Sequence, residues 1–203
     1  MPRVSIITPT YNAFKYITGC IENVAAQKVD GLEHLVVDGG SHDGTVDELR
    51  RLAQVHPHLK FVSEPDKGQS DAMNKGVALA SAAIIGFLNA DDFYEFGAIN
   101  AALPYLDNDA SLAMIVGACR VLNEDGATEF WNKPYNLRPE ALMLGWRYFQ
   151  FPCNPSAYSI VSLSTTRFTM MSTTITRWIS TSLWRWRWSI RCGSLTGIGA
   201  TSA

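Results

Sequence analysis

Two adjacent carboxylates, Asp91 and Asp92, directly follow a short apolar run in the sequence. Neighbouring negative charges repel each other, and a divalent cation that prefers hard oxygen ligands relieves this repulsion. Mg²⁺ or Mn²⁺ held in this way keeps coordination positions open for phosphate oxygens. A solvated Asp-Asp turn is the alternative interpretation of the pair alone, but the apolar run before it and the polar loops described next favour a metal site.

A second polar segment, DGGSHDGT at residues 38–45, combines two acids with three glycines. Glycine lets a ligand come close to the backbone because it has no side chain. Asp38 ends a predicted strand, where its carboxylate can accept hydrogen bonds from a base or a ribose. Asp43 and Thr45 can equally cap the helix that follows, so their role stays open between structure and binding. No Gly-Lys-Ser/Thr sequence follows, which excludes a P-loop.

The third polar segment, EPDKGQSDAMNKG at residues 64–76, is interrupted by glycines. Lys67 can neutralise phosphate charge. Asp71, Asn74 and Lys75 fall on the first turns of the helix predicted here, on the side of the cleft. Each of them can also be a solvated surface residue. This segment therefore indicates a binding site only in combination with the other polar segments.

Short β-rich runs alternate with helical patterns over the first 120 residues. This alternation indicates right-handed βαβ units, and therefore an α/β fold with a mostly parallel open sheet flanked by helices. We expect Pro9 and Pro65 to end two of the strands and Ser70 to cap a helix. Strands are predicted at residues 4–8, 34–37, 59–62 and 83–88, helices at 14–25, 45–55 and 70–80, and a hairpin between residues 112–122 and 128–131.

Polar clusters follow all four predicted strands, and in an open α/β sheet ligands bind at the carboxyl ends of the strands. Four loops that are distant in sequence are therefore expected at one edge of the sheet. This convergence is stronger evidence for a binding site than any single loop. The clusters are residues 10–12, 38–45, 64–70 and 89–92.

The order and spacing of four motifs resemble the family 2 glycosyltransferases, which have the GT-A fold. The motifs are VSIITPTYN at residues 4–12, DGGSHDGT at 38–45, EPDKGQ at 64–69 and NADD at 89–92. The resemblance implies inverting transfer of a sugar from a nucleoside diphosphate sugar, with a bias to UDP. The acceptor would be a hydroxyl of a glycan or of a lipid-linked glycan, as in the synthesis of a cell wall or polysaccharide.

The resemblance also implies roles for individual residues. Thr10 and Tyr11 line the nucleotide pocket, and Asp38 contacts the base. Asp92 ligates the Mn²⁺ or Mg²⁺ that bridges the diphosphate, with Asp91 near the ribose and the metal; such a metal offsets charge on the departing diphosphate. The predicted donor-binding residues are Pro9, Thr10, Tyr11, Asp38, Lys67, Asp71, Asn89 and Asp91, and the predicted metal ligands are Asp91 and Asp92.

The family also needs a general base, usually an Asp or Glu in the second half of the domain, that takes the proton of the acceptor. Residues 152–158 still resemble an acceptor-side loop, but no carboxylate follows Tyr158. Glu124, Glu129 and Glu140 lie too early to match. The general base is therefore not identified, and we expect nucleotide and metal binding with little or no transfer.

Composition divides the chain at the same place. Twelve basic and nineteen acidic residues up to Tyr158 give a net charge of −7, whereas residues 159–203 carry five Arg and no acid, a charge of +5. These last residues also hold eighteen Ser or Thr and four of the six Trp. We therefore predict a nucleotide-sugar-binding domain at residues 1–158, incomplete at its C-terminal side, and an atypical tail at residues 159–203 that is not natively folded.

Three interpretations of the tail are open: a reading-frame slip near Tyr158, disorder or natural divergence, and a cationic Trp-rich arm that binds a membrane or a partner. The genetic code favours the slip. Read one base earlier, the codons of Met170-Met171 and of Trp178-Ile179 each give an Asp without any choice of codon. The arm implies the alternative function, a non-catalytic module that binds nucleotide sugars or a partner.

The remaining features are typical of a cytoplasmic protein. The overall charge of −2 gives no indication of nucleic acid binding. No run approaches the about 18 apolar residues that span a bilayer, and residues 4–8 are too short for the apolar core of a signal peptide; peripheral membrane association stays open. The four Cys show no metal-ligand spacing and are expected to be reduced, and the four His are expected at the surface or in loops.

Overall fold

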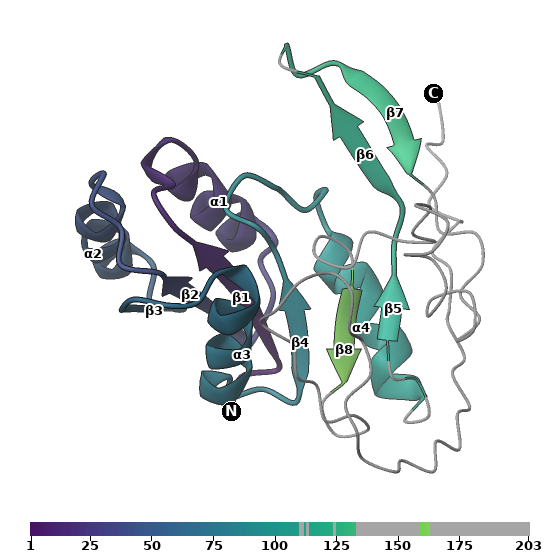
Figure 1. Ribbon diagram of the computed structural model, residues 1–203. Coiled ribbons are helices and arrows are strands. Elements are labelled where there is room, and N and C mark those ends of the chain that lie inside the picture. The colour runs from purple at the N-terminus through teal and green to yellow at the C-terminus, as the bar shows by residue number, and fades with distance from the viewer. Residues whose placement is uncertain (110–111, 113, 124, 133–158, 163–203) are drawn as a thin grey trace, which may run out of the picture.

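The computed structural model describes residues 1–109, 112, 114–123, 125–132 and 159–162. Six strands form one sheet in the order β3-β2-β1-β4-β8-β5 (Figure 1). Four of them run parallel: β1 (Val4–Thr10), β2 (Leu32–Asp38), β3 (Leu59–Ser63) and β4 (Ile84–Phe87). The prediction of a mostly parallel α/β sheet is confirmed.

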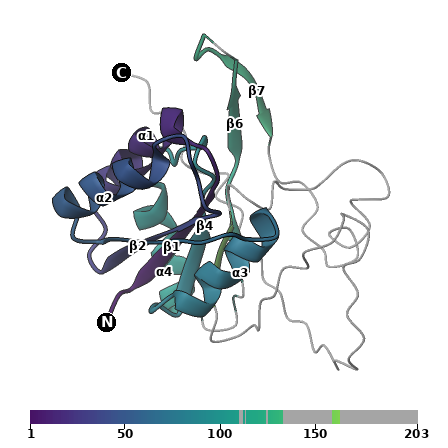
Figure 2. The same cartoon turned by 60° about the vertical axis from the view of Figure 1, so that its left-hand side comes forward.

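Helices cover both faces of this sheet (Figures 1 and 2). They are α1 (Phe14–Ala26), α2 (Thr45–Val55), α3 (Gln69–Leu79) and α4 (Ala98–Asn108). The chain runs from β1 outward to β3 through α1 and α2, then returns through α3 to place β4 on the other side of β1. Right-handed crossovers in opposite directions put α3 on the face opposite α1 and α2. The strand order therefore reverses between β1 and β4.

Apolar side chains on the two faces form separate core clusters. On one face, Ile17 of α1 and Leu49 of α2 pack with Val36 of β2, and all three are fully buried. On the other face, Met73 of α3 packs with Ile7 and Phe87. The α3 backbone comes very close to β1, because a β-carbon at Gly76 would lie only 2.3 Å from Ile7 Cγ2. Gly76 therefore sets how closely α3 sits above the sheet.

The predicted hairpin is present as a second, two-stranded sheet. Its strands are β6 (Cys119–Leu122) and β7 (Thr128–Asn132), which pair antiparallel. Figure 1 shows this hairpin extending away from the main sheet.

Three local predictions are wrong. Pro9 lies inside β1, opposite Val37, instead of ending the strand. It is tolerated because β4 pairs with β1 only as far as Ile7, so no strand in the described part of the chain needs the missing N–H of Pro9. Ser70 lies within α3 and does not cap it, since the helix starts after Gly68, whose φ of 106° favours glycine. His34 is fully buried in β2 and is not a surface residue, because β2 is covered on both faces.

The sheet includes four residues from beyond the predicted domain boundary. β8 (Ser159–Ser162) pairs antiparallel with β4 and with β5 (Met114–Val116). Residues 133–158 and 163–203 lie outside the described part of the chain. The domain boundary and the nature of the tail therefore stay predictions. Among the described residues, no helix has the length and apolar character needed to cross a membrane.

Candidate active site

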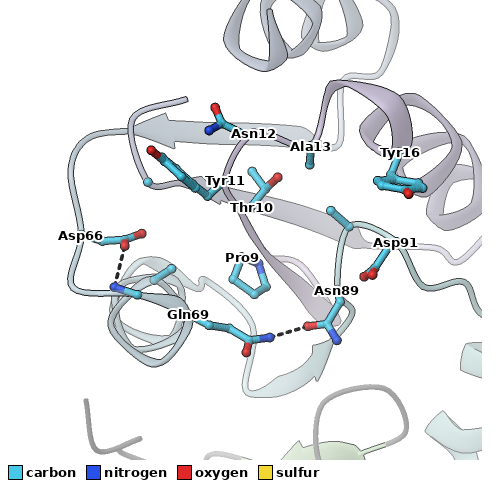
Figure 3. A pocket seen from close by; sticks show the side chains of 14 residues that line it. Pro9, Thr10, Tyr11, Asn12, Ala13, Tyr16, Asp66, Gln69, Asn89 and Asp91 are labelled. Carbon is cyan, nitrogen blue, oxygen red and sulfur yellow. Dashed lines mark hydrogen bonds between the residues drawn. The ribbon is translucent and has the colours of Figure 1, made fainter. Parts of the chain in front are cut away.

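An open pocket of about 790 Å³ lies at the carboxyl edge of the parallel strands (Figure 3). It occupies the point where the strand order reverses between β1 and β4, which is where open α/β sheets bind ligands. The four predicted loops all contribute to its wall. The lining residues are Pro9, Thr10, Tyr11, Asn12, Ala13, Tyr16, Gly39, Asp66, Gly68, Gln69, Ala72, Asn89, Ala90 and Asp91.

The end of β1 and the loop after it supply a hydroxyl and an aromatic ring. Thr10 is 6% exposed, and its Oγ1 has no hydrogen-bond partner within the described residues. Tyr11 is 59% exposed, so its ring is accessible to a ligand. Asn12 connects this loop to the next, because its N–H donates to Ser41 Oγ at 2.7 Å and its Oδ1 accepts from the His42 N–H at 3.1 Å.

Asp38 lies at the end of β2 and is fully buried. Its Oδ2 accepts hydrogen bonds from the N–H groups of Gly40 and Ser41, at 3.0 and 2.9 Å, and from Ser63 Oγ at 2.6 Å. Ser41 Oγ also donates to its Oδ1. Asp38 does not line the pocket. Asp38 is thus buried and holds the loop of Gly40 and Ser41 through hydrogen bonds. Its contact with the base stays a prediction.

Asp43 serves the local structure. Its Oδ1 accepts from the N–H and the hydroxyl of Thr45, at the start of α2, and its Oδ2 accepts from the Phe14 N–H at 3.0 Å. The hydrogen bond from the Thr45 hydroxyl is the main reason why the pKa of Asp43 is lowered. Of the two roles open for Asp43, the geometry favours the capping of α2.

The loop between β3 and α3 brings one acid and one amide into the pocket wall, Asp66 and Gln69. Asp66 Oδ1 accepts from the Gly68 N–H at 2.7 Å. Lys67 is exposed, and its ammonium makes no ion pair within the described residues. Asp71 Oδ2 accepts from the Lys67 N–H at 3.1 Å and lies 3.8 Å from Lys75 Nζ. Lys67 and Asp71 stand beside the pocket and not in its lining.

The loop after β4 connects the predicted metal ligands to the opposite wall. Gln69 Nε2 donates to Asn89 Oδ1 at 2.7 Å, and Asn89 Nδ2 donates to Asp92 Oδ2 at 2.9 Å (Figure 3 shows the first of these). Asp91 lines the pocket, whereas Asp92 is not among its lining residues. Asn89 therefore fixes one carboxylate of the pair relative to α3.

Burial raises the pKa of Asp92, and the neighbouring charge of Asp91 raises it further, against the hydrogen bond from Asn89. A cation beside the pair would remove this penalty. In the described part of the chain, no three acidic, His or Cys side chains gather as a metal cage. Two hard carboxylates fit Mg²⁺ or Mn²⁺ that completes its coordination with phosphate oxygens and water.

Nine of the fourteen lining residues were not among the predicted donor-binding residues, and Tyr16, Asp66 and Gln69 are three of these nine. Tyr16 is 46% exposed and lies one helical turn after Ala13. That i, i+3 spacing from the β1 loop is the signal that could have identified it. Asp66 and Gln69 are polar residues in a loop that follows a strand, which is the signal that could have identified them. The prediction chose their neighbour Lys67 because its positive charge can neutralise phosphate.

The glycosyl transferase family 2 model matches residues 5–176, most of the chain. The chain belongs to this family. Chondroitin synthase of Escherichia coli is 36% identical over 126 residues, which are 62% of this chain and 18% of that protein. Hyaluronan synthase of Pasteurella multocida is 33% identical over 127 residues, 63% of this chain and 13% of that protein. This family 2 chain thus spans less than a fifth of the length of these relatives.

Solved structures support the fold. The mannosyltransferase PcManGT of Pyrobaculum calidifontis, in complex with GDP-Man and Mn²⁺, superposes with a TM-score of 0.53 at 30% identity, over 60% of this chain and 36% of that one. TarS 1–349 of S. aureus, in complex with UDP-GlcNAc, superposes with a TM-score of 0.63 at 20% identity, over 80% and 46% of the two chains. The predictions of a family 2 glycosyltransferase and of a GT-A fold are confirmed.

Proposed function

We propose that this pocket binds a nucleoside diphosphate sugar together with Mn²⁺ or Mg²⁺, for inverting transfer of the sugar to a hydroxyl of a glycan or lipid-linked glycan. The observation that carries the proposal is that one pocket joins the β1 loop to Asp91 at the reversal of strand order. The ligands of the two structural neighbours, GDP-Man with Mn²⁺ and UDP-GlcNAc, support it. So do the polysaccharide synthases among the relatives.

The nucleoside part of the donor is assigned to the β1 side of the pocket. The exposed ring of Tyr11 offers a stacking surface for a base, and such stacking contributes about 1–3 kcal/mol per base. Thr10 Oγ1, which has no partner among the described residues, can exchange a hydrogen bond with the nucleoside. Pro9 and Asn89 complete the wall between this side and the acidic side.

The diphosphate is assigned to the side of Asp91 and Asp92, with Asn89 holding Asp92 in place. The metal ion would supply positive charge to the departing diphosphate. Lys67 is the second source of positive charge, because its ammonium makes no ion pair within the described residues. Lys75, eight residues later, is instead held by Glu64 at 2.9 Å and by the Pro65 carbonyl at 3.0 Å.

This difference between the two lysines gives a test. Replacing Lys67 with Ala should weaken UDP binding about tenfold, since a charge-assisted hydrogen bond contributes about 1.5–3 kcal/mol. It should affect UMP less, because UMP lacks the second phosphate. Lys75→Ala is the matched control, and it should leave the ratio of UDP to UMP affinity unchanged. Titration calorimetry with Mn²⁺ measures both affinities; an unchanged ratio in Lys67→Ala contradicts the assignment of Lys67.

Transfer also needs a general base, and no acid follows Tyr158 in this chain. We therefore expect donor binding with little or no turnover, in a cytoplasmic protein that can associate with the membrane periphery. Release of UDP or GDP from the nucleotide sugars in the presence of glycan acceptors measures turnover. Robust turnover by the purified chain contradicts this part of the proposal.

The reading-frame slip has its own test, which is sequencing of the encoding DNA across Tyr158. An uninterrupted alternative frame whose sequence resembles the family supports the slip. A chain rebuilt in that frame should then gain transfer activity. A stop codon in the alternative frame before residue 170 rules the slip out.

A further inference from the structure

The loop after β2 brings a glycine, and not an acid, to the pocket wall. Gly39 lines the pocket, whereas Asp38 before it is fully buried. The Asp38 carboxylate accepts four hydrogen bonds, from two backbone N–H groups and two serine hydroxyls. A carboxylate engaged in this way has little capacity left for a ligand.

Another acid fills the space that a side chain at position 39 would need. A β-carbon at Gly39 would lie 2.8 Å from Asp66 Oδ2, closer than real β-carbons approach another atom, and 3.2 Å from Asp66 Cγ, which is also a tight contact. Gly39 and Asp66 are therefore complementary: the missing side chain on the β2 loop makes room for a carboxylate from the β3 loop. Both residues line the pocket.

The two oxygens of Asp66 have different surroundings. Oδ1 accepts from the Gly68 N–H at 2.7 Å, which fixes the side chain. Oδ2, the oxygen nearest to Gly39, makes no hydrogen bond to any residue that the structure describes. Asp66 thus offers one oriented acceptor to whatever enters this part of the pocket.

The position of Asp66 indicates which part of a nucleotide would meet it. Figure 3 shows Asp66 and Tyr11 on one side of the pocket and Asp91 on the other. With the diphosphate and metal beside Asp91, the nucleoside extends toward Asp66. A carboxylate repels phosphate, so its partner there must be a hydrogen-bond donor. The Tyr11 ring, held edge to face with His42 at 6.0 Å between centroids, lies on the same side for stacking.

We propose that Asp66 Oδ2 selects the base of the donor nucleotide by accepting a hydrogen bond from a ring N–H. Uracil and guanine carry such a group, at N3 and at N1. Cytosine and adenine instead present a ring nitrogen that is an acceptor. A lone pair of this nitrogen would then face a lone pair of the carboxylate oxygen, with no proton between them. A site built around one hydrogen bond discriminates strongly against ligands that cannot make it. Asp38 then acts as a positioning residue for the Gly39 loop. This inference rests on the proposed nucleotide-sugar function.

The test compares UDP, GDP, CDP and ADP by titration calorimetry on the purified chain with Mn²⁺. The wild-type chain should bind UDP or GDP at least about tenfold more tightly than CDP and ADP. The substitution Asp66→Asn keeps an acceptor for the Gly68 N–H and places an NH₂ donor where Oδ2 stood. The ratio of UDP to CDP affinity should then fall about tenfold or more, because cytosine N3 accepts from this donor.

Three further variants separate a base contact from a structural effect. Asp38→Asn should weaken all four nucleotides by a similar factor and keep their order, and Asp30→Asn, an exposed acid, should change nothing. Gly39→Ala pushes the Asp66 carboxylate away and should lower the UDP to CDP ratio while the chain stays folded by circular dichroism. The exchange Gly39→Asp with Asp66→Gly returns a carboxylate to the same space and should restore the ratio.

Two outcomes overturn the inference. An unchanged ratio of UDP to CDP affinity in folded Asp66→Asn shows that Asp66 does not select the base. A ratio that changes only in Asp38→Asn shows that Asp38 contacts the base. Neither result contradicts the proposed function. A wild-type chain that binds none of the four nucleotides contradicts the proposed function itself, and the base selection with it.

Discussion

The pKa of an acid is shifted in opposite directions at the two edges of the parallel sheet. At the amino edge, the Glu33 side chain is 1% exposed and is surrounded by donors: Ser5 Oγ, Lys60 Nζ, and the N–H and hydroxyl of Ser81. These hydrogen bonds, led by that of Lys60, lower the pKa of Glu33 to about 2, although burial opposes them. At the carboxyl edge, burial raises the pKa of Asp92. The hydrogen-bonding capacity of Glu33, which joins strands, is used within the fold, whereas Asp92 beside the pocket is hydrogen-bonded by Asn89 alone among the side chains named here.

The same contrast holds within the carboxyl edge. Asp38 and Asp43 accept several hydrogen bonds each and shape the loops. Asp66 Oδ2 and Lys67 Nζ, both near the pocket, have no hydrogen bond or ion pair within the described residues. The number of hydrogen bonds accepted therefore separates Asp38 and Asp43, which hold the loops, from Asp66, which we propose to contact the ligand; residue type alone does not make this distinction.

The largest effect is expected from removing a metal ligand. Asp92→Asn should weaken Mn²⁺-dependent UDP binding at least about 100-fold, since even changes in the residues around metal ligands cost 10–100-fold. Its Tm should stay equal or rise, because a half-buried charge next to Asp91 disappears. Asp125→Asn, an exposed acid in the β6–β7 turn, is the control. A fall in Tm with unchanged UDP affinity would show that Asp92 serves stability, as Glu33 does, and would contradict the difference between the two edges.

The opposite result is expected at the amino edge. Glu33→Gln should lower the free energy of unfolding by about 2–3 kcal/mol, because the N–H of Ser81 and the Lys60 ammonium lose a charged acceptor. The affinity for UDP should change little. Urea titration measures the first quantity and calorimetry the second, with exposed Glu22→Gln as the matched control. If UDP affinity falls more than stability, the two edges are not separate in function.

The loss in Glu33→Gln should also depend on pH. The pKa of Glu33 is about 2 in the folded chain, against a usual value of 4.5. Its stabilisation is therefore complete above pH 4.5 and is lost as pH falls toward 2. The difference in stability between the wild-type chain and Glu33→Gln should shrink over this interval. A difference that stays constant between pH 5 and 2.5 contradicts the assignment.

The contact between α3 and β1 carries the next effect. Gly76→Ala would place a methyl group 2.3 Å from Ile7 Cγ2, so α3 must move and stability should fall by about 1–3 kcal/mol. Gly19→Ala in α1 has no atom within 4 Å of the new β-carbon and should raise stability by about 0.5–1 kcal/mol. Because α3 begins at the pocket, Gly76→Ala should also weaken UDP binding. Equal effects of the two substitutions on Tm contradict this account.

A smaller effect is expected from His34. Its Nε2 lies 2.9 Å from Thr8 Oγ1, and burial, with His58 and His56 nearby, lowers its pKa to about 3. The unfolded chain takes up a proton below pH 6.5 and the folded chain does not, so stability falls as pH drops below 6.5, by up to about 1.4 kcal/mol per pH unit. His34→Gln should flatten this slope in urea titrations between pH 6.5 and 4.5. An unchanged slope would exclude His34 as its source.

Much of this architecture was predictable from local patterns. The β-rich runs and helical spacing gave all four parallel strands and three helices close to their observed positions. The convergence of the loops followed from the rule that parallel strands end at one edge. The position of Pro9 inside β1 was not predictable, because it depends on β4 being short. The burial of His34 likewise depends on how the strands are ordered in the sheet.

The site was predicted less completely than the fold. Pro9, Thr10, Tyr11, Asn89 and Asp91 line the pocket, and their contact with a donor stays a prediction. The prediction could not distinguish Asp38 from Asp66, because both are acids at strand ends. Only the packing of Asp66 against Gly39, and the hydrogen bonds around Asp38, separate their roles. Contacts between loops that are distant in sequence carry that information.

The central claim is that the carboxyl edge binds a nucleoside diphosphate through a metal ion. Thermal unfolding of the purified chain with UDP, Mn²⁺ or both tests it most directly. We expect a clear rise in Tm with UDP and Mn²⁺ together, and a much smaller one with either alone. No rise with both, or a rise of the same size with UDP alone, would contradict the claim.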